Sequence, residues 1–141
     1  MDVRKISDDY SVSDQIAPDD MAAIKAAGFR AIMCNRPDGE DWGQPAYDAV
    51  AEAARAEGLE ARWVPVMGGM VTPEAVNEVR AALEDMPGPI LAYCRSGTRC
   101  AMLWSIVKHG ELSSEQIVEA TRTAGYDMSA IIRQLDCSGG A

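Results

Sequence analysis

Short apolar runs and longer segments with helical periodicity alternate along this chain. The runs Ala31–Asn35, Ala61–Val66 and Ile90–Tyr93 have the length and composition of buried strands. A first strand or hairpin is expected over Arg4–Ile6 and Tyr10–Ser13. Because helical segments separate the central runs, we expect right-handed βαβ units. The fold predicted is α/β, with a mostly parallel sheet of four to five strands flanked by helices.

Polar residues between the apolar runs mark the ends of the helices. Pro18, followed by two aspartates, predicts a helix start, because proline fits the first turn and acidic side chains favour its positive end. Gly28 is a suitable stop for this helix. Thr72 predicts the cap of a helix that runs to about residue 85. Further helices are expected over about 46–57 and 100–109. Two more are expected to begin at Ser113 and at Asp127 with Ser129.

The composition is that of one soluble globular domain. The 141 residues are 48% hydrophobic and 25% charged. We expect a single domain over residues 1–137 and a disordered tail over 138–141. Neither an apolar run of about 20 residues nor an N-terminal apolar leader is visible. The sequence therefore predicts a cytoplasmic protein without membrane association.

The net charge of −9 restricts the partners. An acidic chain is a poor ligand for nucleic acid or for an anionic membrane surface. The electrostatic field of the whole chain would likewise not attract a small anionic substrate. Any site for such a substrate must therefore carry its own local positive charge. The sequence leaves the oligomeric state open.

The four cysteines are expected to be free thiols. Cys34, Cys94, Cys100 and Cys137 are irregularly spaced and include no C-x-x-C pair. A chain of this size can build a hydrophobic core and needs no disulfide framework. The only histidine is His109, and no cysteine pair has the spacing of zinc ligands. We therefore expect neither a metal nor a cofactor.

The segment 94–100 carries the clearest chemistry. It follows a predicted strand and leads into a predicted helix, so backbone N–H groups and the helix N-terminus face one small bowl that can hold an anion. Such surroundings lower the pKa of a thiol, which makes Cys94 a candidate nucleophile. The alternative is a buried structural cysteine at the end of a strand.

Other residues of the loop are candidates for substrate binding. Arg99 can clamp an oxyanion, and a cation at the positive end of a helix is unfavourable unless an anion lies there. The alternative for Arg99 is an ordinary solvated arginine. Cys100 is either a small residue of the first helical turn or a resolving thiol for Cys94. The remaining candidates in the loop are Arg95, Ser96, Gly97, which permits positive φ, and Thr98.

Three loops are expected to share this site. Parallel sheets bind ligands beyond the carboxyl ends of their strands, which brings together loops 36–45, 67–71 and 94–99. If the bound anion is a phosphate ester, its cleavage also needs an acid to protonate the leaving oxygen. Asp38 is the first candidate and Glu40 the second, although Pro-Asp-Gly is equally typical of a solvated turn. Arg36 can add positive charge.

The motifs of residues 94–99 (Cys-Arg-Ser-Gly-Thr-Arg), 35–40 (Asn-Arg-Pro-Asp-Gly-Glu) and 88–94 resemble a known bacterial family. It is the phosphatase-like domain of beta-lactamase-hydrolase-like proteins, and the resemblance covers roughly residues 3–110. That family is similar in fold to dual-specificity and protein tyrosine phosphatases. The resemblance implies that Cys94 is the nucleophile and that the 95–99 backbone cradles the anion.

The loop differs from that of protein tyrosine phosphatases, which carry Cys-x5-Arg. Four residues separate Cys94 from Arg99, and Cys100 occupies the usual place of the arginine. The shorter loop also resembles the active loop of rhodanese sulfurtransferases. Three functions follow: a cysteine-dependent phosphatase-like hydrolase, a sulfurtransferase that forms a Cys94 persulfide, or a non-catalytic anion-binding or interaction domain.

Overall fold

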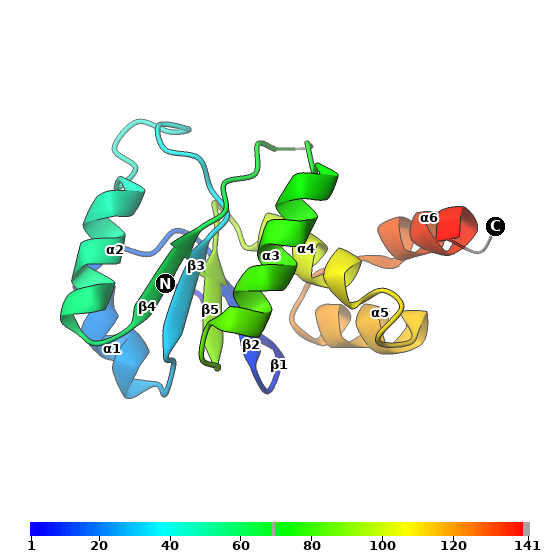
Figure 1. Ribbon diagram of the computed structural model, residues 1–141, viewed down its shortest axis with the longest axis horizontal. Coiled ribbons are helices and arrows are strands. Elements are labelled where there is room, and N and C mark those ends of the chain that lie inside the picture. Colours follow the sequence, from blue (N-terminus) through cyan, green and yellow to red (C-terminus); the bar gives the residue numbers. More distant parts are fainter. Residues whose placement is uncertain (69, 140–141) are drawn as a thin grey trace.

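The computed structural model describes residues 1–68 and 70–139, and these form a five-stranded sheet between two layers of helices (Figure 1). The strand order is β1-β2-β5-β3-β4. Only the outer pair β1–β2 is antiparallel among the neighbouring pairs of this sheet. The predicted α/β fold is confirmed. The strands are β1 (Arg4–Ser7), β2 (Tyr10–Ser13), β3 (Ala31–Cys34), β4 (Glu60–Trp63) and β5 (Ile90–Tyr93).

The helices follow the predicted order. The 3₁₀ turn η1 (Pro18–Asp20) leads into α1 (Met21–Ala26), and then come α2 (Tyr47–Ala56), α3 (Pro73–Asp85), α4 (Thr98–Lys108), α5 (Ser114–Thr123) and α6 (Ser129–Gly139). Thr72 caps α3 as predicted, since its hydroxyl accepts from the backbone N–H of Ala75. The tail predicted over 138–141 overlaps the end of α6, while residues 140–141 lie outside the described residues.

Both faces of the sheet are covered, which explains why its central strands are apolar throughout. Successive side chains of a strand point to opposite faces. Ile32 and Leu91 pack with α1 and α2, whereas Met33 and Ala92 pack with α3 and α4. Helices α5 and α6 both contact α4, and α5 also contacts β1, at the edge of the sheet opposite β4 (Figure 1).

The loops that follow β3, β4 and β5 leave the sheet at the same edge. Figure 1 shows the first two rising side by side above the ends of their strands. Polar side chains on these loops are therefore gathered over the carboxyl ends of the parallel strands. None of the described helices is long and apolar enough to cross a membrane.

Candidate active site

Cys94 directly follows β5 and lies at the N-terminus of α4. Its sulfur accepts the backbone N–H of Gly97 at 3.1 Å, and its side chain is fully buried. Gly97 is the N-cap of α4 and has φ +88°. This left-handed conformation, which favours glycine, turns the loop so that its amides face the sulfur. The helix therefore begins at residue 98, two residues earlier than predicted.

The surroundings of Cys94 lower its pKa to about 5. The largest cause is a hydrogen bond from the Cys100 thiol, and the backbone N–H groups of residues 96, 97 and 100 add to it against the opposing effect of burial. Burial and the neighbouring Cys94 raise the pKa of Cys100. At neutral pH the Cys94 sulfur is therefore a thiolate. The Cys100 thiol keeps its proton and donates a hydrogen bond to Cys94.

Tyr126, in the segment between α5 and α6, supports the loop from behind. Its hydroxyl donates to the carbonyl of Ser96 at 3.1 Å, and a Cβ added to Gly97 would collide with that hydroxyl. The Arg4 guanidinium lies over the Tyr126 ring, 5.7 Å from its centroid. The sequence carries no local signal for Tyr126, because 30 residues separate it from its partner Ser96.

Arg99 is held by a carboxylate from the opposite loop. Its Nη1 and Nη2 bind Glu40 at 2.8 and 2.7 Å, and Nη1 also donates to the carbonyl of Val66 at 2.7 Å. These bonds use three of the five guanidinium N–H donors. The edge that carries Nε remains available for an anion. The ion pair lowers the pKa of Glu40 and raises that of Arg99.

Arg36 connects the same carboxylate to a second one. Its side chain is 4% exposed, and it binds Glu40 through Nε at 2.9 Å and Asp41 through Nη2 at 2.6 Å. Arg95, which is largely exposed, lies 3.4 Å from the same Asp41 carboxylate. Two carboxylates therefore lie among three arginines, which leaves one net positive charge in this network. The charge of Arg36 is thus already paired within its own loop.

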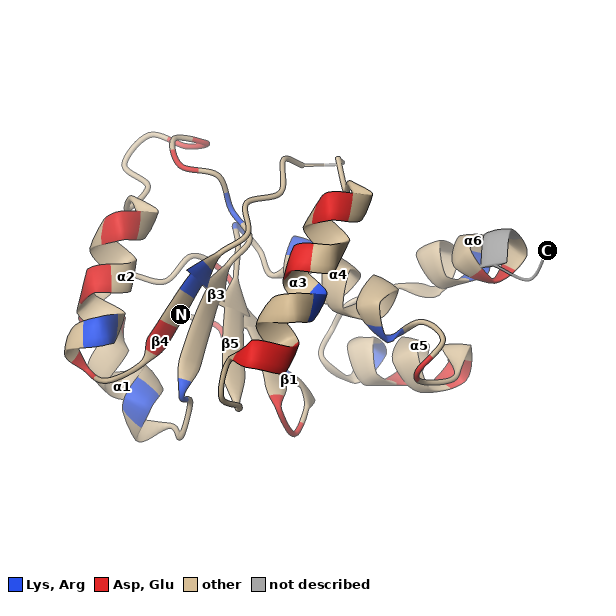
Figure 2. Ribbon diagram, viewed as in Figure 1, with Lys and Arg blue, Asp and Glu red and all other residues tan. Residues whose placement is uncertain are grey.

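The three predicted loops meet around a cavity of about 430 Å³. The convergence expected from topology is therefore present. Figure 2 shows acidic residues on the upper part of the β3–α2 loop and basic residues lower down, where the strands end. Cys94 is buried and is not one of the residues that line the cavity, which are Glu40, Asp41, Gly68, Arg95, Ser96, Thr98 and Arg99.

Asp38 has a different neighbour from the one expected of a catalytic acid. Its Oδ1 accepts the backbone N–H of Tyr47 at 2.9 Å, where α2 begins. It therefore satisfies a free donor at the end of that helix. Asp38 does not line the cavity, whereas Glu40, the second candidate, does. The acid role of Asp38 remains a prediction.

The cysteines and acidic residues give no indication of a metal centre. All four cysteines are free, and only Cys137 among them is exposed. Within residues 1–68 and 70–139, three or more potential ligands do not come together at any point where they could hold a metal ion.

Residues 2–111 match the family model of the beta-lactamase hydrolase-like protein, phosphatase-like domain. Beta-lactamase hydrolase-like proteins of Xylella fastidiosa and Agrobacterium fabrum are 30% and 29% identical to the chain over 138 and 134 residues. These alignments cover 96% and 94% of this chain. The chain spans about a third, 32% and 31%, of the length of those relatives.

Solved structures with the same fold include phosphatases. A candidate phosphatase from Neisseria meningitidis is 28% identical, with a TM-score of 0.85 over 97% of this chain and 98% of that one. The core catalytic domain of a PP-IP phosphatase from S. cerevisiae, at 17% identity, has a TM-score of 0.68 over 96% and 83%. Tk-PTP, at 17% identity, has a TM-score of 0.70 over 96% and 95%, so the fold is that of protein-tyrosine-phosphatase-like domains.

Proposed function

The chain belongs to the family of the phosphatase-like domain of beta-lactamase hydrolase-like proteins, and from that premise we propose that it is a cysteine-dependent hydrolase of phosphate esters. One observation carries the proposal. The Cys94 sulfur lies at the N-terminus of α4, accepts the Gly97 amide and has its pKa lowered to about 5. At neutral pH it is a thiolate nucleophile beside an arginine.

The reaction has two displacement steps. In the first, the Cys94 thiolate attacks phosphorus, the S–P bond forms, and the ester P–O bond breaks with its electron pair going to the leaving oxygen. In the second, water attacks phosphorus and gives up a proton to solvent, where the released oxyanion can take it up. The S–P bond breaks with its electron pair returning to sulfur, which releases inorganic phosphate and restores the thiolate. The phosphoryl group is transferred without any change of oxidation state, so the reaction needs no oxidant.

The transferred phosphoryl group would be held by charge and by backbone donors. The free Nε edge of Arg99 offers a fork of two N–H groups that matches two phosphoryl oxygens. The positive end of α4 adds to this attraction. Arg95, Ser96 and Thr98 line the same cavity and can reach the rest of a small anionic substrate.

Glu40 fits the role of a positioning residue for Arg99 better than that of an acid. Its two oxygens bind Arg99, and its pKa is lowered, so it is ionised at neutral pH. An ionised carboxylate cannot protonate a leaving oxygen. We therefore expect the best substrates to be activated phosphates, such as aryl esters, whose leaving group departs as an anion.

A sulfurtransferase is the second candidate, because only four residues separate Cys94 from Arg99 and make a small bowl. In that reaction, the thiolate attacks the outer sulfur of thiosulfate, the S–S bond breaks and sulfite leaves. Cyanide then takes the sulfur from the Cys94 persulfide as thiocyanate and restores the thiolate. The third candidate is an anion-binding domain without turnover.

One set of assays separates the three candidates. The protein, its Cys94→Ser variant and the control Cys137→Ser, which changes an exposed thiol remote from the site, are assayed with p-nitrophenyl phosphate and with thiosulfate plus cyanide. We expect phosphate release by the wild type and the control, and none by Cys94→Ser. Thiocyanate without phosphate release would favour the sulfurtransferase. Turnover that survives in Cys94→Ser would exclude both cysteine mechanisms, and no turnover at all would favour anion binding.

A further inference from the structure

A second cavity lies at the opposite end of the sheet from Cys94. It has a volume of about 260 Å³ and opens beside the start of β5 and the β1–β2 turn. Pockets for drug-sized ligands are typically about 300–1,000 Å³, so this one suits a smaller molecule. Its lining shares no residue with the cavity above the Cys94 loop. The lining residues are Ser7, Asp9, Tyr10, Leu83, Gly88, Ile90, Trp104 and Lys108.

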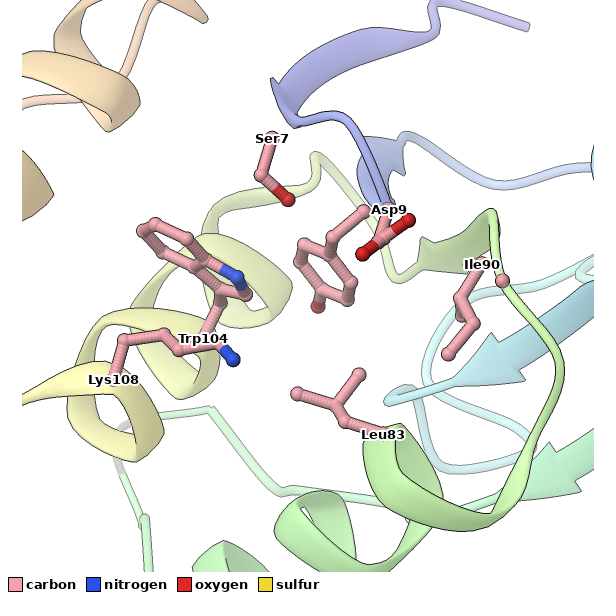
Figure 3. A pocket seen from close by; sticks show the side chains of 8 residues that line it. Ser7, Asp9, Leu83, Ile90, Trp104 and Lys108 are labelled. Carbon is pink, nitrogen blue, oxygen red and sulfur yellow. The ribbon is translucent and has the colours of Figure 1, made fainter. Parts of the chain in front are cut away.

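The floor of this cavity is apolar and aromatic. The Tyr10 and Trp104 rings stack with centroids 6.3 Å apart, and both side chains are almost fully buried. Figure 3 shows the indole nitrogen of Trp104 turned toward the cavity. Among the described residues no acceptor bonds to that N–H group. An indole N–H that faces a cavity without a partner favours a ligand that carries an acceptor there.

Two opposite charges lie on the sides of the cavity. The Asp9 carboxylate and the Lys108 ammonium group point into it from opposite sides, and the Ser7 hydroxyl points in between them (Figure 3). Within the described residues, neither charge belongs to an ion pair, whereas the adjacent Asp8 pairs with Lys5. A ligand with one charge would pair with only one of these groups.

We propose that this cavity binds a small zwitterion, with the chemistry of a free amino acid that has an apolar side chain. Its ammonium group would pair with Asp9, and its carboxylate would bind Lys108 and the Trp104 N–H. The apolar side chain would lie on Tyr10, Leu83 and Ile90. This arrangement satisfies both charges and the indole donor while it removes apolar surface from water.

Calorimetric titration of the full chain with L-leucine and L-phenylalanine tests the proposal. Matched probes each lack one feature: 4-methylpentanoate lacks the ammonium group, isopentylamine lacks the carboxylate, and glycine lacks the apolar side chain. We expect the two amino acids to bind and each of these three probes to bind at least about tenfold more weakly, as expected for the loss of a charged hydrogen bond or of the apolar contact.

Variants assign the binding to the cavity. Asp9→Asn and Lys108→Gln should each weaken L-leucine binding about tenfold or more, whereas Asp8→Asn, on the same turn but outside the cavity, should leave it unchanged. The thermal midpoint checks that each variant is folded. The proposal is wrong if neither amino acid binds at millimolar concentration, if a singly charged probe binds as well as L-leucine, or if Asp9→Asn and Asp8→Asn behave alike. None of these measurements depends on catalysis.

Discussion

Two thiols that share a hydrogen bond, Cys94 and Cys100, have opposite protonation preferences. Cys94 receives donors from the loop backbone at the positive end of a helix, which stabilises its thiolate. Cys100 is fully buried, and a second negative charge beside Cys94 would be unfavourable. The pair therefore ionises once near pH 5, and Cys100 remains a donor.

Replacing Cys100 tests this assignment. Cys100→Ala removes the thiol donor, so the pKa of Cys94 should rise from about 5 by about one to two units, the equivalent of one hydrogen bond to a charged group. The measurement is the pH dependence of Cys94 alkylation by iodoacetamide, followed on the Cys94 peptide by mass spectrometry. Cys100→Ser keeps a donor and should shift the midpoint less. An identical midpoint in wild type and Cys100→Ala would remove Cys100 from this role.

Substitutions also test the separate roles of two carboxylates in the β3–α2 loop, Glu40 and Asp38. Glu40→Gln removes the charge that holds Arg99, so kcat/KM for p-nitrophenyl phosphate should fall about tenfold or more. Asp38→Asn retains an oxygen that can accept the Tyr47 N–H and should leave the pH–rate profile unchanged. If the acidic limb of the profile flattens in Asp38→Asn, Asp38 is the catalytic acid after all.

At the scale of elements, the junction between β5 and α4 depends on the glycine that caps the helix. Gly97→Ala adds a Cβ at positive φ that would collide with Tyr126, so the loop must open and activity should fall about a hundredfold or more. Gly110→Ala, just beyond α4, also has positive φ but meets no atom within 4 Å. It controls for backbone strain, and its kcat/KM should stay near wild type. Equal losses in both variants would show that strain alone matters.

The elements were predictable because their signals are local, and the missed features depend on tertiary contacts. Thr72 marks its helix by its own side chain, and the apolar run at 90–93 marks a buried strand. The direction of Asp38 is set by a hydrogen bond to α2, nine residues away. Tyr126 reaches the Cys94 loop from a segment 30 residues further along the chain. No periodicity in the sequence encodes either contact.

In the whole molecule, the positively charged site around Cys94 lies within a chain whose net charge is −9. Figure 2 shows acidic and basic residues spread over the helices, with further basic residues near the upper ends of the strands. The field of the whole chain repels an anion, so short-range donors from Arg99 and the α4 N-terminus must provide the attraction. The charge of Cys94 is fixed by the Cys100 thiol and the loop backbone N–H groups, and these donors link the site to the stability of the fold.

The pH dependence of unfolding measures that link. The pKa of Cys94 is about 5 in the folded protein and about 9 when the chain is unfolded. Between these values the unfolded state binds more protons, so the Cys94 contribution to stability grows as pH rises and is lost as pH falls toward 5. The free energy of unfolding of wild type minus that of Cys94→Ser should therefore increase from pH 5.5 to pH 8.5. The upper limit of this increase is on the order of 3–4 kcal/mol.

Urea denaturation under reducing conditions at both pH values gives the difference between the two proteins. Groups that the substitution does not affect cancel in this difference. Parallel curves for wild type and Cys94→Ser would mean that Cys94 is protonated in the folded protein, and the nucleophile proposed for this site would then be incorrect.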